Sequence, residues 1–171
     1  MTRIVEGRLK ARFLLLSLGV LALDQWTKWL IETRIPAHSS IEVVPGLFHI
    51  SHVRNTGVAF GLFASSGDGM AALALVALVA LALGCVTWFF WQTPADQKLL
   101  LVALALVLGG AVGNLLDRVT TGAVTDFLGV YLGSYRWPDF NVADSAISVG
   151  IGLIVLDLLR SGARAGAEAR T

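Results

Sequence analysis

Charged residues are scarce in this chain of 171 residues. Asp, Glu, Lys and Arg together make up 15% of it, whereas a soluble domain is about a quarter charged. Apolar residues make up 56%, and the mean hydropathy is +0.73. The length suits one domain, so residues 1–171 are expected to form a single integral membrane domain rather than a soluble protein.

Several residue types and motifs that carry chemistry are also missing. Cys85 is the one cysteine, which excludes an intramolecular disulfide and a CxxC metal or redox site. No HExxH motif is present, so a zinc protease is not expected. The chain lacks the GxSxG and SxxK motifs of serine nucleophiles, a P-loop and a dinucleotide fingerprint, and nothing suggests nucleic-acid binding. We therefore expect neither a metal nor a cofactor.

What the chain does contain is apolar segments long enough to cross a bilayer, which takes about 20 residues. These spans cover approximately residues 13–31, 70–91, 99–116 and 142–159. The short connection QTPADQK makes the second and third spans a helical hairpin. The expected fold is mainly α-helical, a bundle of four transmembrane helices, because helices satisfy their own backbone hydrogen bonds in lipid.

Positive charge is concentrated in two tails, residues 1–12 and 160–171, which carry four and three Lys or Arg residues. The two long connections, 32–69 and 117–139, carry only two each. The positive-inside rule then places both termini in the cytoplasm and both connections outside. The first apolar run lacks a small-residue cleavage site, so we predict a retained helix rather than a removed signal peptide.

The outer loop, residues 32–69, is expected to form a short extracytoplasmic β structure, because IEVVPGLFHISHVRN partly alternates in polarity. The outer segment Arg54–Phe63 begins polar, continues apolar and contains two glycines. We predict that this amphipathic segment lies along the membrane surface and closes over a site, with Asn55 reaching inward. A plain interfacial loop is the alternative.

Two aspartates, Asp126 and Asp144, lie where apolar segments meet the outer connection. Acids at the edge of hydrocarbon are functional suspects, although Asp144 also fits a capping box begun by Asn141. Two close aspartates do not easily ionise together, so one can activate water while the other protonates a carbonyl oxygen. On residue types alone, an ion-coupled carrier that uses a proton relay and a non-catalytic scaffold both stay open.

Other polar residues inside the spans need partners. Asp24 and Lys28 are four residues apart on one helix face and predict a buried ion pair. Asn114 and Arg118 have the same spacing at the outer end of the third span, with Asp117 between them. The alternative for Asp117 and Arg118 is that they only end a helix at the membrane surface.

Five motifs resemble those of the lipoprotein signal peptidases, or signal peptidase II, and they occur in order across all four spans. They are DQWTK (24–28), NTGVAFG (55–61), GGAVGNLLDRV (109–119), VTDF (124–127) and FNVADSAI (140–147). The resemblance implies an aspartic protease of the bacterial inner membrane with its active site on the periplasmic side. Its partners would be membrane lipid and a diacylglyceryl-modified prolipoprotein, cut before the lipidated cysteine. The resemblance also implies inhibition by the cyclic peptide globomycin, and we expect a monomer.

The resemblance further assigns roles to residues by their place in these motifs. The catalytic pair falls on Asp126 and Asp144. Substrate-binding or supporting roles fall on Asn55, Asn114, Arg118 and Asn141, and structural support falls on Asp24 and Lys28. Two departures are Val58, where alanine is common, and Asp139, which adds a third acid near the site.

Overall fold

A computed structural model describes residues 2–57 and 69–168 of the chain. Its elements follow the order α1 Thr2–Arg34, β1 Ser40–Val44, β2 Phe48–Asn55, α2 Gly69–Gln92, α3 Lys98–Thr121, β3 Val124–Leu132, β4 Tyr135–Arg136 and α4 Val142–Glu168. The outer segment from Val58 to Phe63, predicted to close over the site, lies outside the described residues.

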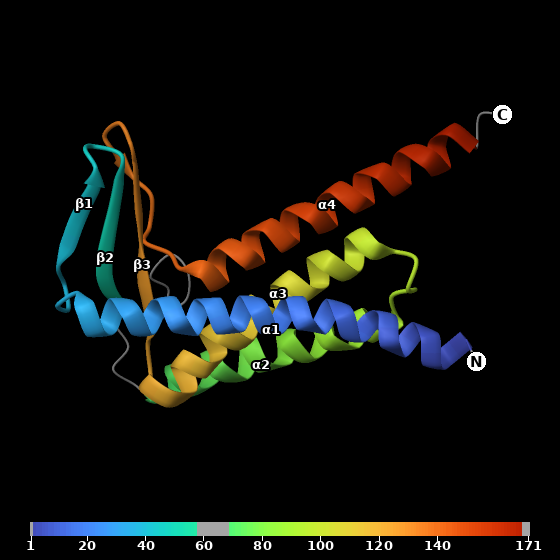
Figure 1. Cartoon of the computed structure of the whole chain (residues 1–171), viewed down its shortest axis with the longest axis horizontal. Helices are drawn as coiled ribbons and strands as arrows, with labels where there is room; N and C mark the ends of the chain where they lie inside the picture. The colour runs from blue at the N-terminus through green and yellow to red at the C-terminus, as the bar shows by residue number, and fades with distance from the viewer. Residues whose placement is uncertain (1, 58–68, 169–171) are drawn as a thin grey trace.

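All four predicted spans are helices, and each helix contains a stretch apolar enough to cross a membrane. The helices are longer than the predicted spans, since α1 and α4 extend into the two tails. Both ends of the chain lie at the same end of the bundle, and the sheet lies at the other (Figure 1). The bundle predicted from the apolar runs is therefore confirmed.

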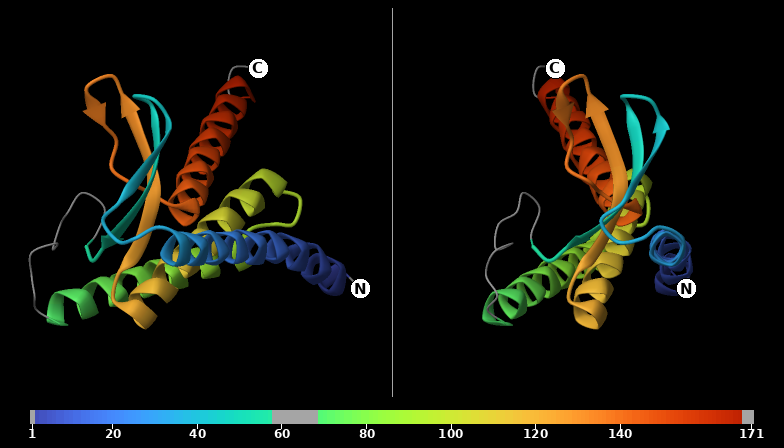
Figure 2. Two further views of the ribbon diagram at one scale, coloured as in Figure 1. Left: turned by 60° about the vertical axis from the view of Figure 1, so that its left-hand side comes forward. Right: turned by 90° about the vertical axis from the view of Figure 1, so that its left-hand side faces the viewer.

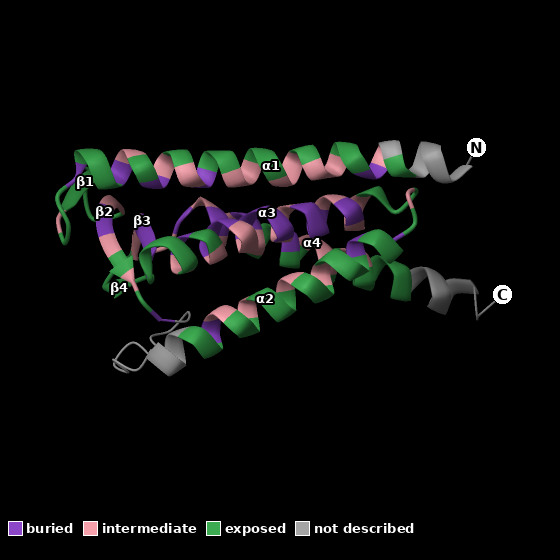
Figure 3. Cartoon of the chain, turned by 90° about the horizontal axis from the view of Figure 1, so that it is seen from below, coloured by how far each residue is buried: buried purple, intermediate pink, exposed green. Residues whose placement is uncertain are grey.

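Helix α3 is the centre of the bundle and packs against α1, α2 and α4. Half of its most apolar stretch is buried inside the protein, against 11–17% for the other helices. Figure 3 shows the difference: α3 carries most of the buried turns, while α1 and α2 expose apolar faces outward. Lipid tails are as apolar as these side chains, so such faces can contact lipid directly and need no covering protein.

The sheet has four antiparallel strands in the order β1-β2-β3-β4 and stands across the end of the bundle (Figure 2). The β structure predicted in the outer loop is confirmed as β1 and β2. The sequence interpretation missed β3, because residues 117–139 read as a connection. In the structure, residues Val124 to Phe127 are all buried. A strand covered on both faces shows no polar–apolar alternation, so its period was hidden.

Two contacts fix the sheet to the helices. Ile31 and Ile35, at the end of α1, pack with Phe127 of β3 in a buried apolar cluster. Helix α3 ends at Gly122, whose φ of 74° is left-handed and whose N–H donates to the Arg118 carbonyl. The chain thereby turns directly from the centre of the bundle into β3. This turn places Asp126 only a few residues beyond the end of α3.

Gly109 allows α1 and α3 to approach closely. A Cβ atom at Gly109 would lie 2.6 Å from the Ser17 carbonyl oxygen of α1. We predict that Gly109→Ala lowers the free energy of unfolding by about 1–3 kcal/mol, the usual cost of overpacking. The measurement is thermal unfolding of the purified protein in detergent. The control is Gly84→Ala on α2, where a Cβ meets nothing within 4 Å. Equal unfolding midpoints for the two variants would contradict this packing.

Candidate active site

Asp126 is a buried strand residue, 3% exposed, opposite Val53 of β2. Its Oδ1 accepts a hydrogen bond of 2.7 Å from Asn141 Nδ2, and its Oδ2 accepts one of 3.0 Å from Asn55 Nδ2. Burial raises the pKa of Asp126 to about 6, and the charge of Asp144 adds to the rise. The two amide hydrogen bonds favour the ionised form and limit how far the pKa rises.

Asp144 lies in the first turn of α4 and makes the capping box that the sequence predicted. Its backbone N–H donates to Asn141 Oδ1 at 2.9 Å, and its Oδ2 accepts from the Asn141 N–H at 3.2 Å. Its Oδ1 accepts a hydrogen bond of 2.7 Å from Asn114 Nδ2 of α3. The capping interpretation is therefore confirmed, yet capping occupies only one of the two carboxylate oxygens.

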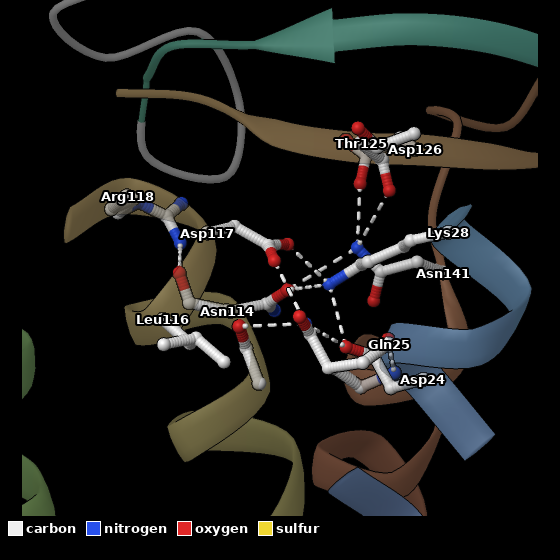
Figure 4. A network of polar contacts seen from close by, with 12 residues as sticks. Asp24, Gln25, Lys28, Asn114, Leu116, Asp117, Arg118, Thr125, Asp126 and Asn141 are labelled. Atoms are coloured by element: carbon white, nitrogen blue, oxygen red, sulfur yellow. Dashed lines mark hydrogen bonds and ion pairs between the residues drawn. The ribbon is translucent and has the colours of Figure 1, made fainter. Parts of the chain in front are cut away.

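Asn141 connects the two aspartates. Its side-chain nitrogen binds Asp126 (Figure 4). Its side-chain oxygen caps α4 by accepting the Asp144 N–H. The residue is fully buried, so this bridge is shielded from water. The two aspartates therefore share one buried asparagine as a hydrogen-bond partner.

Both aspartates line one cavity of about 570 Å³ at the sheet end of the bundle. Asn55, Asn114 and Arg118 line the same cavity. Its apolar wall is lined by Trp137, Pro138, Phe140, Ile147 and Val149. The cavity thus combines an acidic centre with an apolar lining to which α4 contributes.

Arg118 is one of the residues that line this cavity. Its guanidinium group donates to the carbonyl oxygens of Asn114 at 3.0 Å and Gly57 at 3.1 Å. Its Nε is buried and has no hydrogen-bond partner among the described residues. The structure brings Arg118 to the predicted place, and its role in chemistry stays a prediction.

The predicted ion pair between Asp24 and Lys28 is confirmed at 2.7 Å, with both side chains almost fully buried. Lys28 Nζ also lies 2.6 Å from Asp117 Oδ2 and donates to Asn114 Oδ1 at 2.9 Å. Asp24 Oδ1 accepts the Ala143 N–H of α4 at 2.9 Å. These contacts tie α1 to the first turn of α4 and to the asparagine beside Asp144.

Asp117 and Gln25 belong to this network but are absent from the predicted site residues. Gln25 donates to Asp117 Oδ1 at 2.8 Å. The sequence offered one signal: Asp117 lies three residues from Asn114, so both can project from one face of the third span. It gave no sign that this face meets the face of the first span that carries Lys28. Only the α1–α3 crossing shows that these two faces meet.

Asp139, the extra acid noted in the sequence, also lines the cavity. Its Oδ2 forms an ion pair of 2.6 Å with Arg136. Within the described residues, no group of three or more His, Cys, Asp or Glu side chains is placed to hold a metal ion.

These features define a multi-pass membrane protein with a pair of buried aspartates at the sheet end of its bundle. The profile of the family described as signal peptidase (SPase) II matches residues 16–160 of the chain. The lipoprotein signal peptidase of Geobacter sulfurreducens is 48% identical over 147 residues, which cover 86% of this chain and 91% of the relative. That of Symbiobacterium thermophilum is 44% identical over 146 residues, with coverage of 85% and 93%.

A solved bacterial membrane enzyme has the same fold, with a TM-score of 0.81, 32% sequence identity and coverage of 90% of this chain and 91% of that one. The chain therefore belongs to the signal peptidase II family, the lipoprotein signal peptidases. As a member it is a peptidase that processes prolipoproteins. The alternative of an ion-coupled carrier finds no support in these comparisons.

The hydrogen bond from Asn55 predicts how Asp126 titrates. The protonated-carboxyl signal that Asp126→Asn removes from infrared spectra should titrate with a midpoint near pH 6. Asn55→Ala removes a donor that favours the ionised carboxylate, so the midpoint should move to higher pH. Thr56→Ala, at the exposed neighbouring position, should leave it unchanged. A midpoint near 4, the ordinary value for Asp, would contradict the effect of burial.

Proposed function

We propose that this protein is an aspartic endopeptidase that removes signal peptides from diacylglyceryl-modified prolipoproteins by cutting before the lipidated cysteine. One observation supports this most directly: Asp126 and Asp144 line the same cavity and are joined by Asn141. We further propose that the enzyme lies in the bacterial inner membrane with both termini cytoplasmic. The basic tails and the position of both termini at the end opposite the sheet support this orientation.

The environments of the two aspartates favour different protonation states. Burial favours the neutral form of Asp126, whose pKa is about 6, and a bound substrate would exclude more water and raise that pKa further. Both aspartates accept N–H donors at both oxygens, but only Asp144 lies in the first turn of α4, where the helix dipole stabilises negative charge. We therefore assign Asp126 as the acid and Asp144 as the base.

In the reaction, Asp144 takes a proton from a water molecule, and the water oxygen attacks the scissile carbonyl carbon. Asp126 gives its proton to the carbonyl oxygen, which produces a neutral tetrahedral intermediate. When the C–N bond breaks, Asp144 returns the proton to the departing cysteine nitrogen and Asp126 recovers its proton from a hydroxyl group. The products are a signal peptide with a new carboxyl end and a lipidated cysteine with a free amine.

The cavity suits a substrate that is anchored in the membrane. A diacylglyceryl group holds the cysteine at the membrane surface, and the aspartates lie where the helices meet the sheet. The apolar wall formed by Phe140 and Ile147 can hold the apolar signal peptide beside α4. We propose that Arg118, whose guanidinium group donates to two backbone carbonyls, also binds a substrate carbonyl.

Replacement of either aspartate tests this proposal. Asp126→Asn and Asp144→Asn should each lower cleavage of a purified diacylated prolipoprotein by about 10²–10⁴-fold or more, since each removes a proton-transfer group. The measurement is release of the signal peptide in mass spectrometry, with thermal unfolding to show that each variant is folded. Asp157→Asn, the same change further along α4 and outside the cavity lining, should retain full activity.

Two outcomes would overturn the assignment. Substantial cleavage by a folded Asp126→Asn or Asp144→Asn variant would remove that residue from the chemistry. Equal cleavage of prolipoproteins with and without the diacylglyceryl group would reject the proposed substrate, even if both aspartates proved essential.

A further inference from the structure

We infer that Lys28 is a positioning residue for catalysis: it fixes the side-chain amide of Asn114 so that Nδ2, not Oδ1, faces Asp144. This inference rests on the proposed function, in which Asp144 is the base. The sequence suggested only structural support for Lys28, through its pair with Asp24. The contacts of its ammonium group reach further, to a group that binds the proposed base directly.

The ammonium group of Lys28 donates hydrogen bonds to Asp24 and Asn114 and forms an ion pair with Asp117. Nζ lies 2.7 Å from Asp24 Oδ2, 2.6 Å from Asp117 Oδ2 and 2.9 Å from Asn114 Oδ1. Lys28 is 3% exposed, so water does not compete for these protons. Two carboxylates, one from α1 and one from α3, therefore determine the position of Nζ. In that position Nζ also meets the side chain of Asn114.

The third contact decides the orientation of the Asn114 amide. An ammonium group is a donor only, so the atom of Asn114 that faces it must be the oxygen. Asn141 Nδ2 is a second donor to the same oxygen at 3.3 Å. The amide nitrogen is then turned toward Asp144 Oδ1, 2.7 Å away. A flipped amide would place its N–H groups against Lys28 and its oxygen against the Asp144 carboxylate, losing hydrogen bonds on both sides.

Other charges also face Asp144 and must be separated from this effect. Asp126 approaches from β3, Arg118 from α3, and Asp24 with Lys28 from α1. Asp139 lines the same cavity. Removal of Lys28 alone would change the net charge of this group and leave Asp24 and Asp117 buried without a cation, which is strongly destabilising. The test therefore includes two variants that have the same net charge and differ only in whether position 28 offers an N–H donor.

If Lys28 orients Asn114, the effect of losing Lys28 on cleavage should depend on pH. A fixed N–H donor at Oδ1 favours the ionised carboxylate that the base requires. Loss of this donor should impair cleavage most at low pH, where the base is easily protonated, and least at high pH. A purely structural role for Lys28 would instead lower the amount of folded enzyme at every pH.

The experiment compares kcat/KM against pH for Lys28→Met/Asp117→Asn, which loses one positive and one negative charge, with Asp117→Asn alone. The acidic limb of the double variant should lie about one pH unit higher than that of Asp117→Asn, a loss of about tenfold at low pH. The two profiles should converge at high pH. Lys28→Gln/Asp117→Asn has the same net charge as the Met variant but keeps an N–H donor for Asn114 Oδ1, so its acidic limb should lie clearly below that of the Met variant, toward that of Asp117→Asn.

A double-mutant cycle locates the effect at Asn114. In an Asn114→Ala background, adding Lys28→Met to Asp117→Asn should move the acidic limb no further. Coincident acidic limbs for the Met, Gln and single variants would overturn the inference. A shift that the Gln variant shares with the Met variant would also overturn it, since charge and not orientation would be the cause. If the Met variant is not recovered folded, Lys28→Leu/Asp117→Asn takes its place in the same comparison.

The inference can fail independently of the proposed function. If Asp126→Asn and Asp144→Asn are inactive but the Lys28 variants leave the acidic limb in place, the aspartate pair stands and Lys28 is structural. If a folded Asp144→Asn variant cuts normally, the proposed function itself fails.

Discussion

Two carboxylates held close together in a buried place repel each other and lose hydration, so each needs fixed donors. In this protein the donors are amides, and Asn141 is the one that serves both acids. It caps α4 through one end of its side chain and holds Asp126 of β3 through the other. The same asparagine therefore links the sheet to the bundle at the candidate site.

The helices of the bundle hold the two aspartates in place through buried polar contacts between helices. Helix α3 contributes Asn114 to Asp144, and α1 contributes Asp24, which binds the first turn of α4 through the Ala143 N–H. Lys28 forms ion pairs with an acid on each of these helices. Each helix that touches the site does so through a side chain paired with another helix or strand. Rigid placement of this kind is what acid–base chemistry between fixed groups requires.

The sequence predicted the helices, the Asp24–Lys28 pair and the cap of α4, because each depends on local spacing or on long apolar runs. Strand β3 was not predictable in the same way, because Val124 to Phe127 are buried on both faces and show no alternation. Asp117 was missed as a partner of Lys28, since a contact between α1 and α3 has no local signature. The position of Asp126 and Asp144 at the ends of apolar segments marked both as candidates, and the resemblance to family motifs assigned them to one catalytic pair.

The central claim is that Asp126 and Asp144 act on one scissile bond from opposite sides. The most direct measurement is a crystal structure of the enzyme with a lipopeptide whose scissile carbonyl is replaced by a hydroxyl-bearing carbon, which mimics the tetrahedral intermediate. The account predicts the hydroxyl between the two carboxyl groups, with carboxyl oxygens of the pair within about 3–6 Å of each other. A hydroxyl bound by only one aspartate, with the other directed away from the ligand, would contradict it.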